Sequence, residues 1–228
     1  MYDYLICDCD GALVVSEVIA YRTLVEMLSA AFPEVDFAAA SKAAFRSDTP
    51  AMLASLERRF GITLPPGFAA RLAANVESAL ERSRAPIAAV RDVLGRMPLP
   101  AVAVSNRRRA NLTAAVERAG LSGVFGTRLF SAEHVARPKP HPDLHREAAR
   151  QLGAKPEHCL ALADNVAGLN AAREAGMTAI AFVGASHSPN GYAQALRNLG
   201  VGNIIEQMGQ LPALVAGGIR GELRPLQQ

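Results

Sequence analysis

The sequence lacks tryptophan, long apolar runs and long basic runs. Aromatic residues make up only 5% of its 228 residues. No apolar stretch approaches the roughly 18 residues that a membrane-spanning helix needs. Without an aromatic platform or a basic run typical of nucleic-acid binding, we expect neither a nucleic-acid partner nor a membrane. The first residues carry acids and no basic segment, so no secretion signal is expected either.

Cysteine is scarce as well, and Cys7, Cys9 and Cys159 form an odd set with no disulfide pattern. Such usage favours a reducing compartment, and we expect a cytoplasmic protein. Cys7 and Cys9 share one face of an expected buried strand, and no Cys or His group stands at zinc-finger spacing from them. They are therefore interpreted as small buried apolar side chains.

The remaining composition is that of an ordinary globular protein. Apolar residues make up 50% of the chain, charged residues 20%, and the net charge is +3. The mean hydropathy of +0.12 is also typical of this class. The length suffices for one sizeable core with a smaller unit attached. The slight positive charge is attributed to a solvated surface with a few extra Arg residues.

Residues 14–85 are predicted to be all helix, in contrast to the rest of the chain. Apolar residues at helical spacing, punctuated by Gly and Pro, predict helices at 16–31, 37–45, 50–60 and 66–83. Because this block separates the first strand from everything that follows, it is interpreted as an inserted helical cap.

The rest of the chain alternates strands with helices. After the first strand, further strands are expected at 101–104, 127–130, 159–163, 178–183 and 203–205, with helices at 87–97, 108–119, 143–152, 167–175, 192–199 and 211–215. Such alternation predicts an α/β fold with a doubly wound parallel sheet and right-handed crossovers. The core is assigned to residues 1–13 and 86–217, and residues 218–228 to a frayed tail.

The most informative segment lies where the first strand should end. Apolar residues 5–7 are followed by Asp8, Asp10 and Gly11. Carboxylates at the carboxyl end of a buried strand lie where open α/β sheets bind ligands. Two carboxylates so close repel each other, and Mg²⁺ shared with a substrate phosphate relieves that repulsion. The pair therefore predicts phosphoryl chemistry, with one Asp as nucleophile and the other as acid and base.

Three later loops carry polar residues suited to the same chemistry. Ser105 and Asn106 follow a buried strand and offer a hydroxyl and an amide to phosphoryl oxygens. Lys139 lies in a proline-rich loop and offers a point charge for a transferring phosphoryl group. Asp164 follows another strand and is suited to the oxygen shell of the cation. The alternative for Asp164 and Asn165 is that they only cap the next helix.

These segments together resemble the haloacid dehalogenase superfamily, in its β-phosphoglucomutase-like branch with a helical cap after the first strand. Residues 8–17 resemble the family pattern D-x-D-G-T-L-x-D-S-E, while Ser105, Lys139 and Asp164 fall on its second, third and fourth motifs. The resemblance covers nearly the whole chain and implies a Rossmannoid core. Within the branch, the chain is most similar to sugar-phosphate phosphatases of the 6-phosphogluconate phosphatase kind.

The resemblance also implies a mechanism. Asp8 attacks phosphorus and forms an aspartyl-phosphate, and Asp10 protonates the leaving oxygen before activating water. Mg²⁺ is held by the Asp8 carboxylate, the Asp10 main-chain carbonyl and Asp164, while Ser105 and Lys139 hold the remaining phosphoryl oxygens. The chain is thus expected to be a Mg²⁺-dependent phosphatase, a monomer, acting on a small phosphorylated sugar or sugar acid such as 6-phosphogluconate.

Some positions depart from the family pattern. Ala12 replaces the usual Thr, Val15 replaces an Asp, and Ala163 replaces one of two acids in the fourth motif. The loss at Ala163, beside Asn165, motivates an alternative in which catalysis has weakened and the chain binds a phosphate ligand in a regulatory role.

Two neighbouring activities are disfavoured by single positions. Dehalogenases of the superfamily lack the second Asp of the first motif, whereas this chain has Asp10 there. Mutases carry a cap His about ten residues later, where this chain has Ala20. Hydrolysis is therefore favoured, with a β-phosphoglucomutase-like mutase as the remaining alternative.

Basic residues offer further candidate contacts. In the cap, Lys42 and Arg46 are candidates for contacting the carboxylate or hydroxyls of a sugar acid, with a solvated basic face as the alternative. The run Arg107-Arg108-Arg109 is interpreted as the start of an exposed helix, with at most one Arg directed toward the site.

Overall fold

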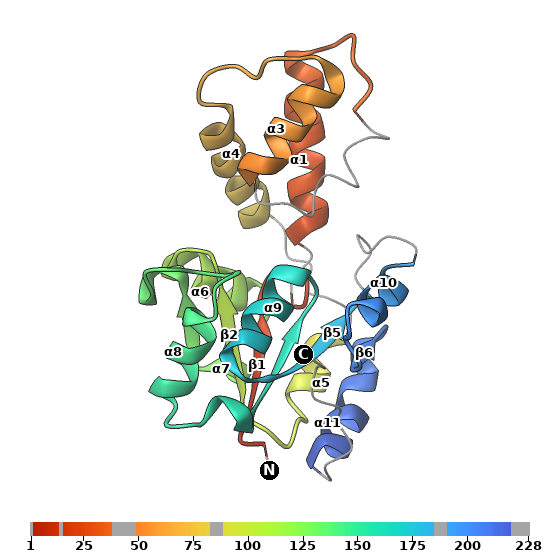
Figure 1. Ribbon diagram of the computed structural model, residues 1–228. Coiled ribbons are helices and arrows are strands. Elements are labelled where there is room, and N and C mark those ends of the chain that lie inside the picture. Colours follow the sequence, from red (N-terminus) through yellow and green to blue (C-terminus); the bar gives the residue numbers. More distant parts are fainter. Residues whose placement is uncertain (1, 14–15, 38–48, 83–88, 185–190, 220–228) are drawn as a thin grey trace. The chain divides into compact units, whose positions relative to one another are not determined.

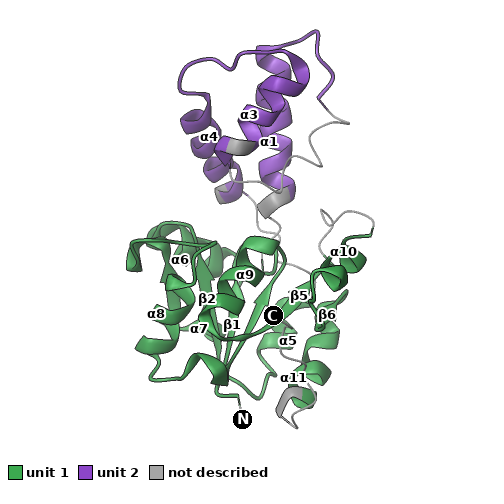
Figure 2. Cartoon of the chain, in the orientation of Figure 1, with its two compact units in different colours: residues 1–15, 85–228 green, residues 16–84 purple. Residues whose placement is uncertain are grey.

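A computed structural model of the chain describes residues 2–13, 16–37, 49–82, 89–184 and 191–219. The chain forms two compact units, one made of Met1–Val15 with Ala85–Gln228 and the other of Ser16–Arg84 (Figure 2). Among the described residues, no helix is both long and apolar enough to span a membrane.

The first unit is built on a six-stranded sheet in the order β3-β2-β1-β4-β5-β6, with every neighbouring pair parallel (Figure 1). The chain adds strands on one side of β1 and then returns to add strands on the other side, which is the doubly wound topology. The predicted fold class is therefore confirmed. The strands are β1 (Tyr4–Asp8), β2 (Ala101–Ser105), β3 (Leu129–Ser131), β4 (Cys159–Ala163), β5 (Thr178–Phe182) and β6 (Ile204–Ile205).

The register brings three strand ends to one edge of the sheet. Asp8, the last residue of β1, pairs with Val104 of β2, while Cys7 pairs with Leu162 of β4. The loops after β1, β2 and β4 therefore start side by side. Since the strand order changes direction between β1 and β4, this edge is where a doubly wound sheet binds its ligand.

Helices cover both faces of this sheet because successive strand residues point to opposite sides. Leu5 and Cys7 of β1 join a cluster with α5, α6, α7 and α11, whereas Ile6 joins a cluster with α8, α9 and α10. The helices are α5 (Val90–Leu94), α6 (Arg109–Arg118), α7 (Ser122–Phe125), α8 (Asp143–Gln151), α9 (Val166–Ala175), α10 (Tyr192–Asn198) and α11 (Leu211–Ile219), with short 3₁₀ turns at Ala132–His134, Pro156–His158 and Met208–Gln210.

The cysteines occupy the places expected for small apolar side chains. Cys7 and Cys9 are fully buried in the same cluster, and Cys159 is buried in the other. All three are free thiols. Burial raises the pKa of both Cys7 and Cys9 far above the usual range, so neither supplies a thiolate for chemistry.

Three elements differ from expectation. Helix α5 is much shorter than the predicted 87–97, and Ala89 before it adopts a left-handed φ of 63°. Helix α7, with four residues, is too short to show periodicity in sequence. Helix α11 continues to Ile219 rather than ending at Val215, so the two residues after Gly217 are helical and not frayed. Buried Leu211 and Val215 hold this helix against the sheet, which outweighs the poor helix propensity of Gly217 and Gly218.

The second unit consists of helices and has its own core. Its helices are α1 (Ser16–Ala31), α3 (Thr49–Phe60) and α4 (Phe68–Arg82). Leu24 and Leu28 of α1 pack with Leu56 of α3 and Leu72 of α4. Phe37 is buried in the same cluster, edge-on to Phe60 with ring centroids 4.9 Å apart. The expected helix at 37–45, together with candidates Lys42 and Arg46, lies outside the described residues apart from Phe37.

Candidate active site

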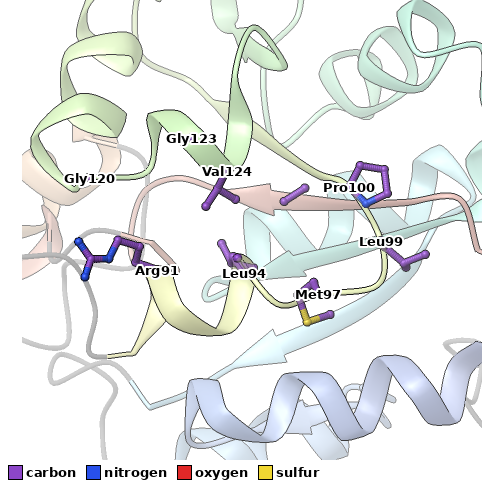
Figure 3. A pocket seen from close by; sticks show the side chains of 10 residues that line it. Arg91, Leu94, Met97, Leu99, Pro100, Gly120, Gly123 and Val124 are labelled. Carbon is purple, nitrogen blue, oxygen red and sulfur yellow. The ribbon is translucent and has the colours of Figure 1, made fainter.

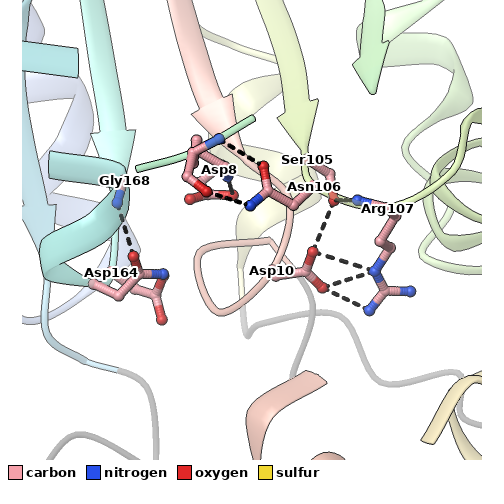
Figure 4. Close-up of polar contacts among 9 residues, drawn as sticks. Asp8, Asp10, Ser105, Asn106, Arg107, Asp164 and Gly168 are labelled. Carbon is pink, nitrogen blue, oxygen red and sulfur yellow. Dashed lines mark hydrogen bonds and ion pairs between the residues drawn. The ribbon is translucent and has the colours of Figure 1, made fainter. Parts of the chain in front are cut away.

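The site expected from the sequence assembles at the carboxyl edge of the sheet. Asp8 and Asp10 come from β1 and its loop, Ser105 and Asn106 from the end of β2, and Asp164 from the loop after β4. Figure 4 shows these side chains converging from adjacent strand ends. The structure thus brings together the predicted residues of the first unit, and their contacts show what each is placed to do.

Asp8 and Lys139 form a buried ion pair. Nζ of Lys139 donates to Oδ1 of Asp8 across 131 residues of sequence. Both side chains are almost inaccessible, with 2% of Asp8 and 7% of Lys139 exposed. A buried carboxylate needs a charge partner, and this lysine supplies it. The pair also places a cation directly beside the carboxylate oxygen at the centre of the site.

Asn106 fixes the main chain at Lys139. Its Nδ2 donates to the Lys139 carbonyl at 2.8 Å, and its Oδ1 accepts from the Lys139 N–H at 3.0 Å. Arg137 and Asp143 brace the same loop with two hydrogen bonds of 3.0 Å. Asn106 was predicted to bind phosphate, but both ends of its amide bond to the loop, so its observed contacts position Lys139. A direct phosphate contact from Asn106 stays a prediction.

The Asp10 carboxylate accepts hydrogen bonds from Ser105 and Arg107. Ser105 Oγ donates to Asp10 Oδ2 at 2.8 Å. Arg107 donates to Asp10 Oδ1 from Nε at 2.9 Å and from Nη2 at 2.6 Å. Burial alone would raise the pKa of Asp10, but the Arg107 charge, with hydrogen bonds from Arg107 and Ser105, outweighs it and holds that pKa below its usual range.

Arg107 is the functional candidate that sequence reasoning did not single out. The sequence indicated only that at most one residue of the Arg107-Arg108-Arg109 run would turn inward. Its place directly after Ser105-Asn106 was the one available signal, since a residue at a strand end shares the edge where ligands bind.

Asp164 and Asn165, which were both considered as caps of the next helix, differ in what they contact. Asn165 is the N-cap of α9, with Oδ1 accepting from the Gly168 N–H at 2.8 Å. Asp164 does not serve as the N-cap residue of that helix. Its side chain is buried, with Oδ1 accepting from Asn165 Nδ2 at 2.9 Å. Tyr192 Oη donates to its main-chain carbonyl at 3.1 Å.

Two glycines keep space beside the buried carboxylates. A Cβ built on Gly11 would lie 1.8 Å from Asp164 Oδ2, and one built on Gly168 would lie 2.7 Å from Asp8 Oδ2. Neither position accepts a side chain without moving a carboxylate. The same point beside Gly168 is 2.9 Å from the Cβ of Ala163, so Gly168 is packed closely against both Asp8 and Ala163.

The residues present fit a magnesium ion. Among the described residues, no three His, Cys, Asp or Glu side chains cluster as a complete metal site. Mg²⁺ in proteins often takes only one or two carboxylates and completes its shell with water and substrate phosphate. Asp8 and Asp164 supply two buried carboxylates flanked by glycines. The Asp10 side chain is engaged by Arg107, so Asp10 fits this set through its main-chain carbonyl, as the resemblance implies.

A separate hollow lies at the opposite end of β2. It has a volume of about 420 Å³ and is lined by residues of α5, the segment before β2 and the middle of α7, including Arg91, Leu94, Leu99 and Val124 (Figure 3). Because it borders Ala101, the first residue of β2, it faces away from the strand ends that carry Asp8 and Ser105. It is therefore no part of the candidate active site.

His145 is a buried histidine on α8, only 2% exposed. Burial, with a smaller contribution from the Lys139 charge, lowers the pKa of His145 to about 3. Its Nδ1 has no hydrogen-bond partner among the described residues. Since the folded-state pKa is below the unfolded value, the unfolded chain binds the extra proton first, and stability falls as pH drops below about 6.5.

We therefore expect His145→Phe to flatten the pH dependence of stability. The free energy of unfolding of the wild-type chain should lose up to roughly 4 kcal/mol from this group between pH 6.5 and 3, and the variant should not show that loss. Urea unfolding at several pH values measures it. His141→Gln, at an exposed histidine, is the control and should retain the wild-type slope. Parallel curves for wild type and His145→Phe would contradict the expectation.

The fold and the site define a class of protein: a doubly wound α/β protein with a buried carboxylate, paired with a lysine, at the end of its central strand. The sequence profile described as haloacid dehalogenase-like hydrolase matches residues 2–176, and the chain belongs to this family. The resemblance read from the four motifs is thereby confirmed.

The chain is also similar to individual proteins of known sequence and structure. The chain is 29% identical over 192 residues to the 6-phosphogluconate phosphatase of Escherichia coli K12, covering 79% of this chain and 82% of that protein. Among solved structures, a haloacid dehalogenase-like protein of unknown function from Agrobacterium tumefaciens superposes with a TM-score of 0.84, at 29% identity, covering 96% of this chain and all (100%) of that one.

A second solved structure was determined with phosphate bound. It is a hydrolase of the same family from Deinococcus radiodurans, with phosphate and sodium, and it superposes with a TM-score of 0.78 at 29% identity over 98% of each chain. Family membership and the phosphatase names of the curated relatives support a phosphatase.

Proposed function

We propose that the chain is a Mg²⁺-dependent phosphomonoesterase that acts on a small phosphorylated sugar or sugar acid, such as 6-phosphogluconate. The observation that carries this proposal is the buried Asp8–Lys139 ion pair at the end of β1. A carboxylate so placed is a nucleophile with a cation beside it, and the relative that acts on 6-phosphogluconate spans most of this chain.

The reaction proceeds in two displacements at phosphorus. In the first, an Asp8 carboxylate oxygen bonds to phosphorus and the bond to the leaving oxygen breaks. Arg107 lowers the pKa of Asp10, so Asp10 first takes up a proton from the bound phosphate monoester or from solvent and then gives it to that oxygen. In the second, Asp10 takes a proton from water, the water oxygen bonds to phosphorus, and the bond to Asp8 breaks. Phosphate leaves, and both aspartates return to their starting states.

The surrounding residues balance the charge of the phosphoryl group. Lys139 is placed to neutralise one oxygen beside Asp8, and the Ser105 hydroxyl is placed to donate to another. Both groups bond to the chain's own carboxylates, Asp8 and Asp10 respectively, so a phosphoryl group would engage donors that already favour anions. Asp8, Asp164 and the Asp10 carbonyl would hold Mg²⁺, which when bound offsets the remaining charge on the phosphoryl oxygens.

A second candidate function is retained because of Ala163. This position carries an acid in the family pattern, and here it holds a small apolar side chain that is 1% exposed, at the end of β4 beside Asp164. With one fewer carboxylate, the chain could have kept phosphate binding and lost turnover. The two candidates differ in a single measurable property, which is hydrolysis.

Phosphate release from a panel of esters distinguishes these candidates. We expect Mg²⁺-dependent hydrolysis of p-nitrophenyl phosphate and of 6-phosphogluconate, abolished by EDTA and restored by added Mg²⁺. The kcat/KM for 6-phosphogluconate should exceed that for glucose 6-phosphate by about tenfold or more if a sugar-acid carboxylate is recognised. Binding of vanadate without turnover of any ester, at any Mg²⁺ concentration, would contradict the phosphatase and support the binding role. Conversion of β-glucose 1-phosphate to glucose 6-phosphate would instead indicate a mutase.

A further inference from the structure

Arg107 makes a two-pronged contact with the carboxylate of Asp10. Its Nε lies 2.9 Å from Oδ1 and 3.2 Å from Oδ2, and its Nη2 lies 2.6 Å from Oδ1. The two residues are 97 positions apart in sequence. A planar guanidinium that grips a carboxylate in this way fixes both its place and its rotation, which a lysine ammonium does not do.

Ser105 completes a small ring with these two residues. Its Oγ donates to Asp10 Oδ2 at 2.8 Å and accepts from the Arg107 main-chain N–H at 3.1 Å. The end of β2 therefore orients Asp10 twice, once through a side-chain hydroxyl and once through a side-chain guanidinium. The Arg107 side chain is 10% exposed, compared with 30% for Asp10, so the arginine lies behind the carboxylate that it holds.

The other two residues of the arginine run have different partners. Arg108 pairs with Glu133 at 3.3 Å and is 83% exposed. The Arg109 side chain donates to the main-chain carbonyl of Leu129, and its N–H bonds to Glu133 at 2.9 Å. Of the three, Arg107 alone contacts a residue of the candidate active site, among the contacts of the described residues.

We propose that Arg107 is a positioning residue that acts through Asp10. Arg107 holds the Asp10 carboxylate within hydrogen-bond distance of the Ser105 hydroxyl, which is placed to bind the phosphoryl group. It thereby fixes the position from which Asp10 exchanges a proton with the leaving oxygen. This inference rests on the proposed phosphatase function and extends it to a residue outside the four motifs. Proton transfer tolerates little misplacement, since an error of about 1 Å can cost a hundredfold in rate.

Arg107→Met is the direct test, because methionine keeps much of the length and removes both prongs. We expect kcat for an alkyl ester such as 6-phosphogluconate to fall by about 10- to 100-fold, with KM changed less than about threefold. The loss for p-nitrophenyl phosphate should be smaller, because its leaving group needs little protonation. Arg107→Lys keeps the charge and should recover only part of the rate.

A double-mutant cycle separates positioning from direct substrate contact. In an Asp10→Asn background, Arg107→Met should add less than about a threefold further loss, because the group through which it acts is already disabled. Arg108→Met applies the same change one residue away, at an exposed side chain, and should leave both substrates unaffected. Thermal unfolding of each variant shows whether it is folded, and Arg107→Lys keeps the test informative where Arg107→Met is not folded.

Three results would overturn the inference. One is an unchanged kcat in Arg107→Met, another is an equal loss on both substrates, and the third is a loss that persists undiminished in the Asp10→Asn background with a raised KM. The last would assign Arg107 to substrate binding. If Asp10→Asn alone has no effect, then the proposed function fails first, so the two failures are distinguishable.

Discussion

Replacement of Asp8 by Asn is expected to abolish phosphate release, with a fall in kcat of about 10⁴-fold or more. The amide has nearly the shape of the carboxylate but is not a nucleophile, so no aspartyl-phosphate forms. Phosphate release from p-nitrophenyl phosphate under saturating Mg²⁺ measures the loss. Acid quenching of the wild-type enzyme during turnover should leave a covalent phosphate on the protein, and the variant should carry none.

The control for this substitution is Asp3→Asn, just before the same strand. Asp3 is 48% exposed and pairs with His158, so the same chemical change there should leave kcat unaltered. Asp8→Asn also removes the partner of buried Lys139, and an unpaired buried charge destabilises a fold. Thermal unfolding therefore accompanies the assay. A folded Asp8→Asn protein that retains a tenth of the wild-type rate would contradict the nucleophile assignment.

The sequence was sufficient for the architecture because the strands were marked by buried apolar runs and the longer helices by their period, although the short helix α7 was not. Placement of polar residues at the ends of those runs then implied where they would meet, since parallel strands end at one edge. Asp8 and Lys139 are the strongest example, because they are 131 residues apart and yet form one ion pair. Their motif context, rather than their spacing, made them recognisable.

Contacts between side chains of different loops could not be predicted from the sequence. Asn106 was read as a phosphate donor because an amide after a strand can serve that purpose, but its two hydrogen bonds to Lys139 depend on the path of a distant loop. Arg107 was one of three adjacent arginines of equal chemistry. Arg107 turns inward because it follows Ser105 closely at the end of β2. There both residues donate hydrogen bonds to Asp10.

The sequence also did not reveal how closely Gly11 approaches the carboxylate of Asp164. Gly11 follows Asp10 with a φ of 75°, a turn conformation that glycine adopts without strain. The structure adds a second requirement, because any side chain at this position would meet Asp164. The two requirements make different predictions for a substitution, since a turn affects stability whereas a clash with Asp164 affects the metal site.

Gly11→Ala is therefore expected to impair magnesium use far more than folding. Its Cβ would lie 1.8 Å from Oδ2 and 2.3 Å from Cγ of Asp164, so that carboxylate must move by more than an ångström. We expect the Mg²⁺ concentration for half-maximal activity to rise about tenfold or more, and kcat to fall by about a hundredfold. Titration of phosphate release with Mg²⁺ measures both.

Gly153→Ala is the matched control for the backbone. Gly153 also has a left-handed φ, 67°, but a Cβ there meets nothing within 4 Å. Both variants pay roughly 1 kcal/mol for an alanine in that conformation, and only Gly11→Ala displaces a carboxylate. Equal Mg²⁺ titrations for the two variants would show that Asp164 does not hold the metal. A selective defect in Gly11→Ala, reproduced by Asp164→Asn, would tie the space beside Gly11 to the ion, because both changes reach the same oxygen by different routes.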